Sequence, residues 1–114
     1  MIALAFVSAL LLGISACGSS SDTTSEAVTV SGNTAQIKMQ NTKFSPDDLT
    51  VDKGATVTWS NEDSTTHTVT AGNGAFNSGN LAPGKNFGYT FNETGTFDYS
   101  CTIHPGMKGK VTVK

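Results

Sequence analysis

The fold of this chain is decided by residues 97–113, which read FDYSCTIHPGMKGKVTV. Apolar and polar side chains alternate before a short turn and again after it. The alternating apolar residues are Phe97, Tyr99, Cys101, Val111 and Val113. Side chains two residues apart on a β-strand point to the same face of a sheet. The stretch therefore predicts two strands, each with one apolar face, joined by a turn that follows Cys101.

The same period of two continues upstream to about residue 35. The predicted inward faces are Ile37 and Met39; Leu49 and Val51; Ala55, Val57 and Trp59; His67, Val69 and Ala71; and Phe87, Tyr89 and Phe91. Turn-forming segments such as Asn92-Glu93-Thr94-Gly95 separate these runs, and no long stretch has helical periodicity. The pattern predicts an all-β fold, a small antiparallel sandwich or barrel of six or seven short strands.

Length and charge exclude several classes of protein. The chain has 114 residues, which is enough for one domain. It contains seven lysines, no arginine and nine acidic residues. Nucleic-acid binding requires a strongly basic face, so this composition argues against such a partner.

The N-terminal segment has a different composition from the rest. Residues 1–16 have no charged side chain, and they are too few for a membrane span, so they predict a signal peptide. Ile14-Ser15-Ala16-Cys17 resembles the lipobox of bacterial lipoproteins, in which the signal is cut before the cysteine and the cysteine carries lipid. The resemblance implies a domain anchored by Cys17 to the periplasmic or cell-surface face of a bacterial membrane. An ordinary signal peptide with a chance cysteine, or an uncleaved anchor, is the alternative.

Residues 17–34 are rich in Ser, Thr, Gly and Asn and predict a flexible tether, with a weak edge strand possible at 27–30. The folded domain is then 35–114. A domain of this size often needs a disulfide or a metal for stability. Lipidation of Cys17 would leave Cys101 without a disulfide partner in the same chain, so a metal is the remaining common device.

Cys101, His104 and Met107 follow one another at intervals of three residues. A lone cysteine is usually a small buried hydrophobe, a lone histidine is usually hydrogen-bonded, and a lone methionine usually fills space in the core. Together they lie in one turn, where Pro105 restricts the backbone, so three donors can face one point. His67 is the only other histidine and begins an inward face, which predicts that it meets the turn at the same end of the domain.

One thiolate, two imidazoles and a thioether suit a copper ion that alternates between Cu(I) and Cu(II). Zinc could occupy the same donors, but it has no redox chemistry and structural zinc sites rarely use methionine. The chain has no Cys-x-x-Cys-His motif for haem and too few cysteines for an iron–sulfur cluster.

Residues 95–113 resemble the copper-binding end of the cupredoxins, most closely the plastocyanin and amicyanin branch with the short amicyanin-like ligand loop. Gly54 to Asn61 resembles the strand before the first ligand histidine, and the likeness covers about residues 36–114. It implies an eight-stranded Greek-key sandwich with one type 1 copper ion. Carried over, His67, Cys101 and His104 are the equatorial ligands and Met107 is the axial ligand.

Two positions depart from the family pattern. Thr68 stands where relatives commonly have Asn. In the family, the backbone N–H at this position donates to the cysteine sulfur, and any residue except Pro can do the same. The family's Asn side chain also ties neighbouring loops together, and the Thr hydroxyl can imitate this only in part. Gly106 replaces a bulky residue and makes the surface around His104 less apolar.

These residues predict outer-sphere electron transfer without a bound substrate. His104 is the expected electron port, and Pro105 with the loop 81–84 forms an expected docking patch for redox proteins, unless that loop is a plain turn. The chain is expected to be a monomer. It is not expected to be an enzyme, because a copper oxidase or nitrite reductase needs further histidines as copper ligands. A copper carrier or storage protein is the nearest alternative, and a structural sandwich with chance residues is the remaining one.

Overall fold

The computed structural model describes residues 27–114, and these residues form nine strands. The strands are β1 (Ala27–Thr29), β2 (Thr34–Gln40), β3 (Lys43–Ser45), β4 (Asp48–Val51), β5 (Thr56–Asn61), β6 (Thr70–Ala71), β7 (Asn86–Thr90), β8 (Gly95–Ser100) and β9 (Lys108–Val113). The described range contains no apolar helix long enough to cross a membrane. The predicted all-β class is confirmed.

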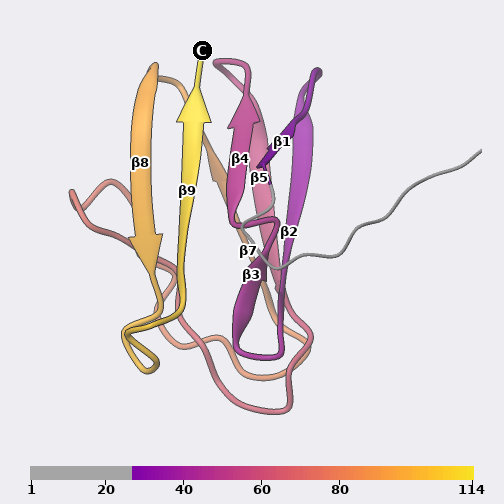
Figure 1. Cartoon of the computed structure of the whole chain (residues 1–114), viewed down its shortest axis with the longest axis vertical. Coiled ribbons are helices and arrows are strands. Elements are labelled where there is room, and N and C mark those ends of the chain that lie inside the picture. Colours follow the sequence, from indigo (N-terminus) through magenta and orange to yellow (C-terminus); the bar gives the residue numbers. More distant parts are fainter. Residues whose placement is uncertain (1–26) are drawn as a thin grey trace, which may run out of the picture.

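The strands form two sheets, one in the order β1-β4-β9-β8-β6 and the other in the order β3-β2-β5-β7 (Figure 1). The expectation of purely antiparallel pairing is wrong. The pairs β1·β4, β2·β5 and β4·β9 are parallel. These neighbours are not joined by hairpins, because the chain crosses between the two sheets before it returns, and such connections allow parallel pairing.

The core lies between the two sheets and follows the predicted alternation. β2 and β5 bury every second side chain, and Trp59 at the centre is 0% exposed. The ring centroids of Phe76, Phe87, Phe91 and Tyr99 lie 5.4–6.5 Å from that of Trp59. Burial of each large apolar side chain contributes about 1.5–3 kcal/mol. Phe87 is only half-buried because β7 is an edge strand.

The predicted signal peptide, Cys17 and most of the predicted tether lie outside the described residues. The last part of the tether range is described, and it contains β1, which pairs with the outer edge of β4. The Val30 N–H then donates to the Thr50 carbonyl at 2.9 Å. The chain therefore enters the domain along one edge of the five-stranded sheet.

One end of the sandwich gathers three connections. The β8–β9 loop lies there, at the end opposite the C-terminus, together with the β2–β3 turn and the segment that follows β5 (Figure 1). This end contains the residues that the sequence predicts as metal ligands.

Candidate metal centre

Cys101 directly follows β8 and is completely buried. Its N–H donates to the Met107 carbonyl at 3.0 Å, and the Met107 N–H donates to the His104 carbonyl at 2.8 Å. The loop is thus closed by its own backbone hydrogen bonds. Met107 is 3% exposed, so its thioether also belongs to the interior. The predicted turn is confirmed.

His67 arrives from a distant part of the chain. Its N–H donates to the Leu81 carbonyl at 3.1 Å, and the Leu81 N–H donates back at 2.8 Å. The predicted inward face of His67, Val69 and Ala71 is buried, and the strand that follows His67 is short, since β6 comprises Thr70–Ala71. His67, Thr68 and Val69 are all buried, since Thr68 lies against the ligand loop rather than facing solvent.

The donor atoms of three predicted ligands converge. The Nδ1 atoms of His67 and His104 each lie 3.8 Å from Cys101 Sγ, and the three donor atoms lie within 4.8 Å of one another. Nitrogen and sulfur bound to one ion at about 2.0 and 2.3 Å in a trigonal plane are about 3.7 Å apart. The spacing of the donor atoms therefore fits a metal ion that would be held by two imidazoles and one thiolate.

Thr68 performs the task that the sequence predicts for its backbone. Its N–H donates to Cys101 Sγ, with the two atoms 3.3 Å apart. Its hydroxyl accepts the Thr102 N–H at 2.9 Å and so ties the first-histidine segment to the ligand loop. Desolvation raises the pKa of the Cys101 thiol, but hydrogen bonds from Thr68 and His104 outweigh it, and the pKa is lowered. The site favours the thiolate, which is the form that binds metals.

Comparison with known proteins identifies the family. Residues 3–113 match the family model described as Cupredoxin-like domain. The chain belongs to the cupredoxin-like family. The predicted resemblance is confirmed. Family membership and the cluster of potential metal ligands together confirm the predicted cofactor, one copper ion.

Individual relatives agree with this assignment. Amicyanin from Paracoccus versutus is 32% identical over 93 residues, which cover 77% of this chain and 70% of that protein. Amicyanin from Paracoccus denitrificans is 38% identical over 77 residues, covering 63% and 59%. A purple cupredoxin from Nitrosopumilus maritimus superposes with a TM-score of 0.66 at 37% identity, covering 70% of this chain and 99% of that chain.

A copper-containing nitrite reductase from Thermus scotoductus also matches, with a TM-score of 0.66 at 28% identity. The match covers 70% of this chain but only 22% of that enzyme. The cupredoxin-like domain is thus one part of a larger protein in that case.

Asp63 belongs to the site although the sequence did not point to it. The carboxylate Oδ2 lies 2.7 Å from His67 Nε2, on the side of the ring away from Cys101. The acid stands four residues before the histidine in the sequence, but that spacing has no meaning until the loop between them folds back. Desolvation raises the pKa of Asp63, while hydrogen bonds from Thr42, His67 and Asn41 lower it more, so the net pKa lies below its usual value.

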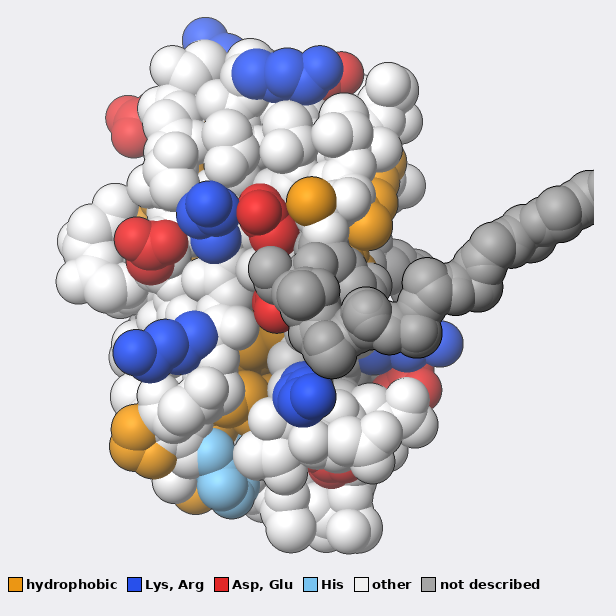
Figure 2. Space-filling view, in the orientation of Figure 1, with side chains coloured by type: hydrophobic (Ala, Val, Ile, Leu, Met, Phe, Trp, Pro, Cys, Tyr) orange, Lys and Arg blue, Asp and Glu red, His pale blue; other side chains and the backbone are white. Residues whose placement is uncertain are grey.

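The two histidines of this cupredoxin-like chain differ in exposure. His67 is 0% exposed, whereas His104 is partly exposed. Figure 2 shows histidine atoms, in pale blue, at the surface with hydrophobic side chains beside them. Ile103, with 45% exposure, and Pro105 belong to this surface. Leu81, which the sequence placed in the docking patch, is 7% exposed and packs inward because its backbone pairs with His67.

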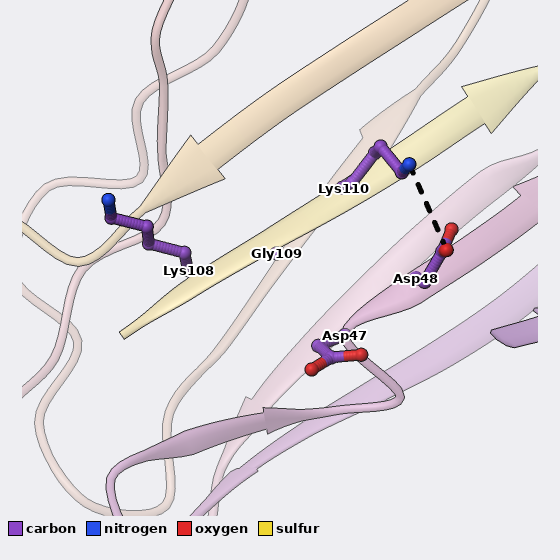
Figure 3. Close-up of a pocket in the computed structure, with 5 residues that line it drawn as sticks. All are labelled: Asp47, Asp48, Lys108, Gly109 and Lys110. Carbon is purple, nitrogen blue, oxygen red and sulfur yellow. Dashed lines mark ion pairs between the residues drawn. The ribbon is translucent and has the colours of Figure 1, made fainter. Parts of the chain in front are cut away.

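A shallow hollow near the start of β9 holds charges of both signs. Asp47, Asp48, Lys108, Gly109 and Lys110 line it. Lys110 Nζ lies 3.8 Å from Asp48 Oδ2, while Lys108 points away from both acids (Figure 3). The positive charge of Lys108 is therefore presented to solvent immediately after the ligand loop.

Proposed function

We propose that this chain is an electron carrier that cycles one type 1 copper ion between Cu(I) and Cu(II) outside the cytoplasm. His67, Cys101, His104 and Met107 would hold this ion. The observation that carries the proposal is the convergence of both imidazole Nδ1 atoms at 3.8 Å from a buried, hydrogen-bonded Cys101 sulfur.

Copper bound here supplies a one-electron couple. The protein's own contribution is to hold the donors in one arrangement for both oxidation states. The loop from Cys101 to Met107 is closed by backbone hydrogen bonds, and Thr68 ties it to the His67 segment. With the donors fixed in advance, little reorganisation accompanies the gain or loss of an electron. Because the protein supplies all four donors, no substrate needs to bind the metal.

His104 is the route by which electrons enter and leave. Among His67, Cys101, His104 and Met107, it is the only residue that is not buried. Exposed Ile103 and Pro105 flank it, and the exposed Lys108 follows the loop. A small apolar patch of this kind suits the short-lived contacts of redox proteins, which use small interfaces. We expect the carrier to dock its partners here as a monomer.

We further propose that lipidated Cys17 anchors the protein to a bacterial membrane. The lipobox-like sequence before it supports this. β1 lies at the outer edge of the five-stranded sheet, with β4 between it and β9. A tether that enters through β1 leaves the β8–β9 ligand loop free to meet soluble or membrane-bound partners. Replacement of Cys17 by Ser should move the protein from the membrane fraction to the soluble fraction without changing its spectrum.

The visible spectrum of the copper-loaded, oxidised protein tests the carrier proposal. We expect an intense thiolate-to-copper band that bleaches reversibly on reduction. Cys101→Ala should abolish the band, while Met107→Leu should retain it and chiefly shift the reduction potential. A colourless Cu(II) form, or a Cu(I) form that resists oxidation, would instead indicate a copper carrier or storage protein.

An enzymatic role has less support. The nitrite reductase that shares this fold is much longer than the chain. The sequence contains two histidines, and the proposed site uses both. A second, catalytic copper ion would therefore lack imidazole ligands from this chain.

A further inference from the structure

The carboxylate of Asp63 lies directly behind His67 and receives three donors. The Asn41 N–H donates to Oδ1 at 2.7 Å, and the Thr42 N–H donates to Oδ2 at 2.9 Å. His67 Nε2 lies 2.7 Å from the same Oδ2. The Asp63 N–H in turn donates to Asn61 Oδ1 at 2.9 Å. Both oxygens of the carboxylate are thus committed, and its position is fixed from several directions.

The turn that clamps Asp63 has an unusual backbone. Asn41 and Thr42 both have φ of +58°, in the left-handed region. Asn tolerates this region, but a β-branched residue such as Thr rarely adopts it. Strained backbone of this kind persists where surrounding contacts over-determine it, and it clusters at functional sites. Here the two N–H groups of the strained turn point at one carboxylate, and that carboxylate contacts a ligand histidine.

The contact determines which nitrogen of His67 carries hydrogen. An ionised carboxylate only accepts hydrogen bonds, so Nε2 must be the protonated nitrogen. Nδ1 then has a free lone pair on the side of the ring that faces Cys101 Sγ at 3.8 Å. The Thr65 hydroxyl lies 3.5 Å from Nε2, too far to compete with the carboxylate.

His104 has no equivalent support. Within residues 27–114 its Nε2 has no hydrogen-bond partner, and its Nδ1 faces Cys101 Sγ. The two imidazoles lie close together, with ring centroids 4.9 Å apart. One ligand ring is therefore held by a fixed negative charge, and the other is free at the surface.

We propose that Asp63 is a positioning residue of the copper centre. Its carboxylate, clamped by Asn41 and Thr42, holds His67 as the Nε2–H tautomer and stabilises Cu(II) relative to Cu(I). The proposal rests on the proposed function in one respect, that the bound ion is copper. Hydrogen bonds from ligand histidines to carboxylates orient the ring and raise its basicity, and their loss typically costs 10–100-fold in metal affinity.

The test compares the full chain with the Asp63→Asn variant. A carboxamide has only one acceptor oxygen, so it cannot serve three donors bound to two oxygens. We expect Cu(II) affinity to fall by about 10–100-fold, with a smaller loss for Cu(I). The reduction potential should rise by about 59 mV for each tenfold change in that ratio. The thiolate band should remain, because Cys101 and Thr68 are untouched.

A second readout needs no metal. In the metal-free wild-type protein, ¹⁵N NMR should show His67 as the Nε2–H tautomer with a proton protected from exchange. Asp63→Asn should give a mixture of tautomers. If wild-type His67 carries its proton on Nδ1, the proposal is wrong, whether or not the variant folds. This measurement is independent of electron transfer, so a failure of the proposed function would be seen separately in the colour of the copper-loaded protein.

Glu62→Gln is the matched control. It removes the negative charge of the exposed neighbouring carboxylate, whose side chain accepts the Ser60 hydroxyl at 3.2 Å. We expect its potential and its His67 tautomer to match those of the wild type. Asp63→Glu keeps the negative charge, and its potential should lie closer to the wild type than that of Asp63→Asn. Equal potentials for Asp63→Asn and the wild type, or an equal shift in Glu62→Gln, would overturn the proposal.

Discussion

Replacement of Asn61 by Ala is expected to destabilise the metal-free protein by about 3 kcal/mol. Asn61 ends β5 on its inward face and is 1% exposed. Its side-chain N–H groups donate to the carbonyls of Thr65 at 2.9 Å and Leu81 at 2.8 Å, and its oxygen accepts the Asp63 N–H at 2.9 Å. Each net hydrogen bond is worth about 1 kcal/mol, and alanine removes all three.

Asn73 provides the matched control. Its side-chain oxygen accepts the N–H of the residue two positions later, Ala75, at the same distance of 2.9 Å. It is exposed, and this is its only side-chain bond within residues 27–114. Asn73→Ala should therefore cost about 1 kcal/mol or less. Urea unfolding of both variants, with unchanged m values, measures the difference. If the two variants lose free energy of unfolding by amounts that agree within about 0.5 kcal/mol, the claim that Asn61 holds the His67 loop is refuted.

Two further outcomes follow from single contacts. Gly109→Ala should lower the free energy of unfolding, measured with heat or urea, by about 1–3 kcal/mol, because a Cβ there would overlap the phenol of buried Tyr99. Gly106→Ala is the control and should change stability little, because a Cβ there meets open space. Equal losses of stability in the two variants would contradict the predicted overlap with Tyr99. The pKa of Asp63 in the folded protein lies below its ordinary value of 3.8. The ionised carboxylate therefore stabilises the fold at pH values above 3.8, and this stabilisation is lost as the pH falls through the folded-state pKa. The metal-free Asp63→Asn variant should therefore lose less stability than the wild type between about pH 4 and pH 2, and parallel curves would show that Asp63 is not the group responsible.

Much of the fold could be predicted because strand periodicity is a property of the backbone. The alternation from Ile37 to Val113 marked the buried faces of most strands correctly. The pairing of those strands was less accessible. β2 lies between β3 and β5, antiparallel to one and parallel to the other, and no local pattern distinguishes the two edges of a strand.

The same limit applies to surfaces. Leu81 lies in a loop with proline and glycine, so the sequence predicted that it belongs to an exposed patch. Two backbone hydrogen bonds with His67 instead orient its side chain toward the core. Ile103, which the sequence did not place in the docking patch, is 45% exposed and precedes His104 in the loop. Exposure in loops depends on which distant segment lies behind them.

The sequence alone determined the half of the site that lies within one loop. Cys101, His104 and Met107 are so close along the chain that a single turn must bring them together, whatever the rest of the fold does. Tertiary structure decided the other half. His67 reaches Cys101 across 34 positions through its pairing with Leu81, and Asp63 reaches His67 only because the β2–β3 turn closes over it. Short spacings are set by backbone geometry, whereas these contacts exist only after the two sheets have packed.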